Sequence, residues 1–250
     1  MNMDQERYQI LTQILGMDGR KIIKRLENIQ LSVLHDKEHL LVTNPSWNIL
    51  TDARIRSINT LFSSLRRTGL GFVFLNELLD NDWFQLHSPT STRELKIDQV
   101  VSFEKLVKYN FGMDFFTCIE TSFRIFLRVL EPNACNSGTG PFKNVYEFLL
   151  GPNLLNFQDD ERPFAIELIN LSRLLRNLIH NSGVYFSNDG RNEIASYKGK
   201  IYTFRHGKPI DFMYWEFLLE ITDDIHKLLG KVISHPRIEG IPHILDPYCI

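Results

Sequence analysis

The chain has 250 residues, of which 43% are hydrophobic and 23% are charged, and its formal net charge is −2. This composition is typical of one large globular domain, or of a core domain with an additional helical layer. The near-neutral charge excludes a strongly basic coat for nucleic acid, so any contact with RNA has to come from a local patch.

The cysteines and the hydropathy pattern indicate a cytoplasmic protein. Cys118, Cys135 and Cys249 are far apart and odd in number, which predicts reduced thiols. No apolar run approaches the roughly 18 residues of a membrane span, and the N-terminus lacks the pattern of a secretion signal. We therefore expect no contact with a membrane.

Helical periodicity dominates the first part of the chain, residues 1–95, to which the sequence assigns no role. Thr51 or Asp52 is a suitable N-cap for its third helix, and Gly69–Gly71 predicts a break. The helices are expected at residues 4–15, 19–34, about 52–67 and about 71–79. A polar stretch at residues 83–97 is expected to be an exposed linker.

The second part, residues 96–250, predicts further helices and one β-hairpin insertion. Alternation around glycines places the hairpin at about residues 194–208. Pro163 suits the first turn of a helix, and Gly183 suits the position after its end. The helices are expected at residues 99–109, 114–130, 142–150, 162–181 and about 211–233. The fold class is therefore all-α, with a small β-hairpin and an extra N-terminal helical region.

One segment concentrates the chemically useful side chains: residues 173–181, with the sequence RLLRNLIHN. At 3.6 residues per turn, Arg173, Arg176 and His180 form a column on one side of the helix. Arginine is a permanent cation suited to phosphate, and histidine exchanges protons near neutral pH. These are the residue types needed for metal-free cleavage of RNA or for binding of phosphate.

The same helix predicts that its cationic side is covered. Ile166 and Ile169 lie on that side, opposite an apolar stripe formed by Phe164, Leu168, Leu171, Leu175 and Leu178. Either another helix of the chain or a second subunit is expected there. Burial of arginine costs free energy unless it is paired, so the cover must supply carboxylates, carbonyl groups or a bound anion. A purely structural role stays open, because Arg and His also favour the negative end of the helix dipole.

Residues 176–185 (RNLIHNSGVY) and the hairpin residues 197–204 (YKGKIYTF) resemble the HEPN superfamily, the higher eukaryote and prokaryote nucleotide-binding domains. The likeness is to bacterial defence-associated and plasmid-borne members, and it covers about residues 100–235. It implies an antiparallel helical bundle that forms a homodimer and brings two Arg…His motifs together. Active members are metal-independent endoribonucleases, many of them toxins or phage-defence effectors.

The resemblance implies a role for each motif residue. His180 would act as a general base on a ribose 2′-hydroxyl, or as an acid toward the leaving oxygen. Arg176, with Arg173, would stabilise the charge on the phosphate in the transition state. Asn177 would position a phosphate oxygen or the imidazole. The expected product carries a 2′,3′-cyclic phosphate, and DNA is not cut.

Two supporting residues complete the expected site. Glu120, on a segment that resembles the preceding core helix of the family, would orient an arginine or His180, and Asn181 follows the histidine. The alternative for Glu120 is a pair with Arg124 within its own helix. In the family pattern, four to six residues separate the arginine from the histidine, and a polar residue usually follows the arginine directly. Arg173 has the expected distance to His180, whereas Arg176 has the polar residue directly after it.

The leading hypothesis is thus a HEPN-like endoribonuclease that needs no metal or cofactor. Its expected partners are RNA, a second copy of the chain and a regulatory or antitoxin protein. Two alternatives stay open. One is a non-catalytic HEPN-like module that binds RNA, a nucleotide or a protein, and the other is a helical scaffold in which the polar residues serve the fold.

Overall fold

The computed structural model of this chain describes residues 3–15, 17–78, 86–87, 92–157 and 161–247, and this part is mostly helical. The helices are α1 (Met3–Leu15), α2 (Gly19–Thr43), α3 (Ala53–Glu77), α5 (Arg93–Leu130), α6 (Phe142–Leu149), α7 (Glu161–His180), α8 (Trp215–Ile233) and α9 (Pro236–Glu239). The strands β1 (Val184–Tyr185) and β4 (Lys208–Pro209) pair antiparallel, as do β2 (Glu193–Tyr197) and β3 (Lys200–Phe204). The expected all-α class with a small hairpin is confirmed at this level.

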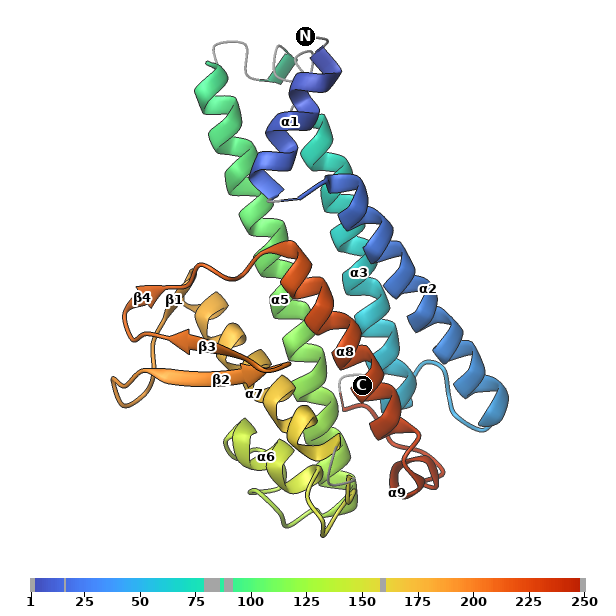
Figure 1. The fold of residues 1–250 in the computed structure, drawn as a ribbon. Coiled ribbons are helices and arrows are strands. Elements are labelled where there is room, and N and C mark those ends of the chain that lie inside the picture. The colour runs from blue at the N-terminus through green and yellow to red at the C-terminus, as the bar shows by residue number, and fades with distance from the viewer. Residues whose placement is uncertain (1–2, 16, 79–85, 88–91, 158–160, 248–250) are drawn as a thin grey trace.

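The long helix α5 runs through the middle of the molecule (Figure 1). Helix α3 packs on both α2 and α5, α7 packs on α5, and α8 contacts α2, α5 and α7. One hydrophobic core runs through these helices and includes Ile58, Phe115, Leu175 and Trp215. Helices from both sides of the proposed boundary at residues 95 and 96 share this core, and the division into two parts stays a prediction.

Three helices are longer than the sequence predicts. Helix α2, expected at residues 19–34, continues to Thr43, and glycines explain the lengths of the other two. The break expected at Gly69–Gly71 is wrong, because α3 continues through it. A Cβ atom on Gly71 would come within 2.9 Å of both methyl groups of Val107 on α5. The helices expected at 99–109 and 114–130 likewise form the single helix α5, in which Gly112 lies against Ile179 of α7. These glycines permit close helix packing and do not end the helices.

Some expectations fall at the limits of the described chain. Most of the linker expected at residues 83–97 lies outside the described residues, and so does Cys249. Helix α5 begins within that stretch, where the hydroxyl group of Thr92 accepts a hydrogen bond from the backbone of Leu95 at 3.3 Å. This N-cap fixes the start of the helix.

Helix α7 forms almost where it is expected, at Glu161–His180 instead of 162–181. Its apolar side is buried at Leu168, Leu171, Leu175 and Leu178. Gly183 ends it as predicted: its φ is +91°, and its N–H donates to the carbonyl of Leu178 at 2.9 Å. A left-handed backbone of this kind is most easily adopted by glycine.

The β-hairpin turns tightly between β2 and β3. Lys198 and Gly199 form a two-residue turn with φ values of +50° and +73°, as a type I′ turn requires. One face of the hairpin is buried through Ala195, Tyr197 and Phe204. These aromatic rings belong to the hydrophobic core.

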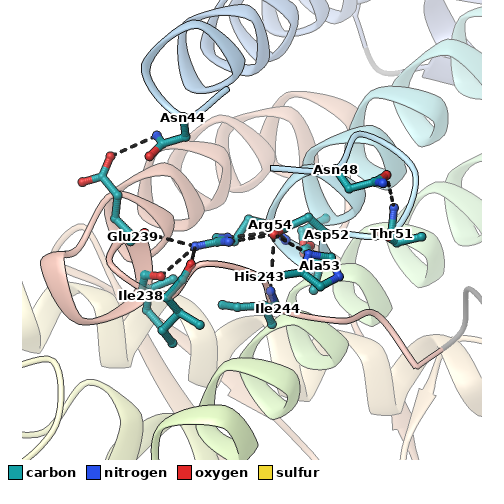
Figure 2. A network of polar contacts seen from close by, with 12 residues as sticks. Asn44, Asn48, Thr51, Asp52, Ala53, Arg54, Ile238, Glu239, His243 and Ile244 are labelled. Carbon is teal, nitrogen blue, oxygen red and sulfur yellow. Dashed lines mark hydrogen bonds and ion pairs between the residues drawn. The ribbon is translucent and has the colours of Figure 1, made fainter. Parts of the chain in front are cut away.

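The C-terminal segment is attached to the start of α3 by hydrogen bonds from Arg54, which also forms a buried ion pair there (Figure 2). Asp52 and Arg54 are fully buried, and Arg54 donates to both carboxylate oxygens at 2.9 and 2.7 Å. Its remaining donor group reaches the carbonyl oxygens of Ile238, Glu239 and Ile241. The backbone N–H of Arg54 donates to Asp52 at 3.0 Å, so the expected N-cap at Asp52 is present. This network joins residues far apart in the sequence.

Candidate functional site

Arg173 is held by the hairpin. Its guanidinium donates to Glu193 of β2 at 2.6 Å and to the side-chain oxygen of Asn170 at 3.1 Å. Glu193 also accepts a hydrogen bond from the hydroxyl of Tyr185. Burial raises the pKa of Glu193, but the bonds from Tyr185 and Arg173 outweigh burial and the pKa is lowered. Glu193 is therefore a carboxylate at neutral pH, and it neutralises Arg173.

Arg176 is held by the central helix. Its guanidinium forms an ion pair with Glu120 of α5, which also pairs with Arg124 at 2.7 Å. Arg124 in turn donates to the carbonyls of Gly138 and Gly140, each at 2.7 Å. Glu120 thus contacts an arginine of the motif and also forms the pair within its own helix. Both expected arrangements of Glu120 are present together.

The cover that the sequence predicts over the arginines is part of the chain itself. Helix α5 and strand β2 supply one carboxylate each, and carboxylates are one of the three kinds of partner that the sequence leaves open. Three guanidinium groups, those of Arg124, Arg173 and Arg176, contact the carboxylates of Glu120 and Glu193. Burial lowers the pKa of Arg176 from its ordinary value, and the group stays a cation.

The two asparagines of the motif stabilise the end of α7. The side-chain amide of Asn177 donates to the carbonyl of Phe186 at 2.6 Å, just beyond β1. The amide of Asn181 donates to the side-chain oxygen of Asn177 at 2.9 Å and to its backbone carbonyl at 2.8 Å. Asn177 is therefore used to connect the helix to the following segment.

His180 is exposed and stands apart from these pairs. Among the described residues it has no hydrogen bond or ion pair, although it shares a face of α7 with Arg173 and Arg176. The two arginines form ion pairs with different elements, Arg173 with β2 and Arg176 with α5. The fold brings Glu120 to Arg176 and Asn181 to Asn177, but among the described residues neither arginine has a hydrogen bond to His180.

Three hollows in the described part of the chain are lined by other residues. One, of about 320 Å³, lies between α3 and α5 and includes Ser57, Asp114 and Ser122. A second between the same helices measures about 590 Å³ and includes Leu70, Phe74 and Leu106. The third lies at the start of α7. The motif residues line none of these three.

The sequence interpretation missed Glu193. Its signal was present, because an acidic residue two positions before Ala195 and four before Tyr197 shares their face of the strand. That face packs on α7, so a carboxylate there has to meet a cation. The register confirms the placement, with Glu193 opposite Phe204.

Comparisons of the chain with known protein families, with curated proteins and with solved structures find no match. The likeness to HEPN proteins therefore rests on the motif and hairpin residues alone. None of the described helices has the length and apolar character that a membrane span requires. Within the described residues, no three His, Cys, Asp or Glu side chains are grouped to hold a metal ion.

Proposed function

We propose that this chain is a non-catalytic binding module, in which the Arg173–Asn181 segment serves mainly to hold α7 against α5 and the hairpin. The observation that carries the proposal is the internal neutralisation of both arginines, Arg173 by Glu193 and Arg176 by Glu120. The finer assignment to HEPN-like bundles belongs to the proposal, supported by the helical fold and the motif at the end of α7.

Electrostatics supports this choice over RNA cleavage. A phosphate that approached either arginine would have to displace a carboxylate already in contact with it, or bind beside that carboxylate against its repulsion. Because carboxylates already contact Arg173 and Arg176, these arginines offer little attraction for the RNA backbone, whose binding relies on several phosphate contacts. His180 also lacks an acidic partner, within the described residues, that would orient its ring for proton transfer.

RNA cleavage tests the proposal. Purified protein would be incubated with labelled single-stranded RNA in the presence of a chelator. We expect the wild-type protein and the His180→Ala variant to leave the RNA equally intact. His39→Ala, at an exposed position of α2, is the matched control for a surface histidine. Cleavage that disappears in His180→Ala and persists in His39→Ala would overturn the proposal.

A second candidate is the metal-independent endoribonuclease, with a role as a toxin or phage-defence effector. The exposure of His180 on the face of Arg176 favours it. The mechanism requires Arg176 to leave Glu120 and reach the phosphate, while His180 takes the proton of the 2′-hydroxyl. The 2′-oxygen then bonds to phosphorus, the bond from phosphorus to the 5′-oxygen breaks, and the 5′-oxygen takes a proton from the protonated His180 or from water. Products with 2′,3′-cyclic phosphate ends, absent with DNA and with a 2′-deoxy substitution at the cleavage point, would identify this chemistry.

A further inference from the structure

Strand β3 has an outer edge to which no other strand is hydrogen-bonded in the described part of the chain. The hairpin lies beside α7 (Figure 1), and β3 pairs only with β2. Because Tyr197 and Lys200 close the two-residue turn as a hydrogen-bonded pair, the pairs alternate along the hairpin. Tyr202 bonds toward β2, whereas the N–H and C=O groups of Ile201 and Thr203 point outward. Within the described residues these outward groups have no hydrogen-bond partner.

The side chains on the outer face of the hairpin are also exposed to solvent. Ile201 is 73% exposed, and Ile194, its diagonal neighbour on the same face, is 62% exposed. Exposed β-branched side chains on one face of a hairpin suit a strand with similar residues at its centre. The edge contains no proline or bulge that would prevent pairing.

The charges around the edge indicate the kind of partner. Lys200, Arg205 and Lys208 are exposed and form no ion pair with the described residues, and they flank the edge at both ends. Lys198 differs, since it is held by Glu220 at 2.8 Å and Asp224 at 2.6 Å. The unpaired cations favour a ligand whose ends are acidic.

We propose that β3 binds an extended segment of a partner protein, which adds to the hairpin as a third strand. The segment has a β-branched centre of about five residues, matched to the length of β3, and acidic residues on both sides. RNA is the less favoured ligand for this basic surface, because Tyr197 and Phe204 are buried and offer no ring for stacking. This inference goes beyond the proposed function and does not depend on the chemistry at His180.

The probe for the test is a synthetic peptide with valine and threonine at its centre and two glutamates at each end. Amide exchange followed by NMR measures its binding residue by residue. The added strand protects the N–H groups of Ile201 and Thr203 and leaves that of Tyr202 unchanged, since Tyr202 already bonds to β2. Protection of consecutive residues, or of none, would overturn strand addition. A peptide with lysine in place of glutamate should bind at least about tenfold more weakly.

Variants separate the backbone contribution from the charge contribution. Thr203→Pro removes an outward donor without touching the bonds to β2, and it should weaken peptide binding by about tenfold or more. Lys200→Glu combined with Arg205→Glu should weaken it to a similar degree, whereas the exposed control Lys24→Glu on α2 should not. Continued protection of the Tyr202 amide shows that the hairpin of each variant is folded.

RNA gives a distinguishable outcome. The inference would be overturned if the peptide did not bind and single-stranded RNA bound the hairpin instead. In that case charge reversal would abolish RNA binding, and Thr203→Pro would leave it unchanged. That result would leave the proposal of a binding module standing. Conversely, RNA cleavage that depends on His180 would overturn the proposed function and leave the binding of the peptide at β3 untouched.

Discussion

Arg54 offers the clearest test of how this fold is stabilised. It is fully buried, it stacks over Trp47 at 3.6 Å from the ring centre, and it donates to Asp52 and to three carbonyl groups. Arg54→Met keeps much of the volume but leaves the Asp52 carboxylate buried without its cation. Removal of one member of a buried pair costs about 3–5 kcal/mol.

Urea unfolding measures this cost. A loss of that size lowers the unfolding midpoint by about 1–2.5 M if the dependence on urea is about 2–3 kcal/mol per molar. The matched control is Arg56→Ala, because Arg56 is 41% exposed and lies 3.4 Å from Asp246. The control should cost less than about 1 kcal/mol. Equal effects of the two substitutions would refute the reasoning.

A second substitution checks that the charge causes the loss. Asp52→Asn in the Arg54→Met background removes the carboxylate that has lost Arg54 and still lies 3.3 Å from the ring of His243, while keeping an N-cap for α3. The double variant should therefore be more stable than Arg54→Met alone. A double variant that is less stable would mean that packing and not charge explains the effect.

Further predictions concern pH and the end of α7. Burial lowers the pKa of His226, and the nearby Asp36 and Asp223 offset only part of this effect. Below the ordinary histidine pKa of about 6.5, the folded state therefore binds fewer protons than the unfolded state. The free energy of unfolding is at its full value above that pH and decreases as the pH falls below it. Urea unfolding between about pH 7.5 and 5 should show this loss, and a flat profile would contradict it. Gly183→Ala should destabilise by about 1–3 kcal/mol, more than Gly190→Ala, because both glycines have positive φ but only Gly183 lies against the ring and hydroxyl of Tyr109. Equal losses in thermal unfolding would contradict that contact.

Helix α7 and the hairpin could be predicted because their signals are local. A leucine stripe, Pro163 in the first turn and Gly183 after the end determine α7 within a residue of its observed limits. Alternation around Gly199 determines the hairpin in the same way. Such features depend on neighbouring residues in the sequence, so they need no knowledge of the rest of the fold.

The continuity of α3 and α5 could not be predicted, because their glycines pack against residues that are far away in the sequence. Gly71 faces Val107, and Gly112 faces Ile179, across helix contacts that no local pattern contains. In the candidate site, Arg176 and Glu120 were both recognised, but their pairing depends on how α7 packs against α5. The sequence alone shows which residues have useful chemistry. Whether a carboxylate of the chain forms an ion pair with an arginine depends on how the helices pack.

The most direct test of the central claim, that carboxylates of the chain itself hold the motif arginines, is a double-mutant cycle on Arg176 and Glu120. The free energy of unfolding would be measured for Arg176→Met, Glu120→Gln and the double variant. Because Arg176 is 32% exposed and Glu120 13% exposed, solvent screening reduces the interaction, and we expect a coupling of about 1–2 kcal/mol. A coupling near zero, with both single variants as stable as the wild type, would contradict the account.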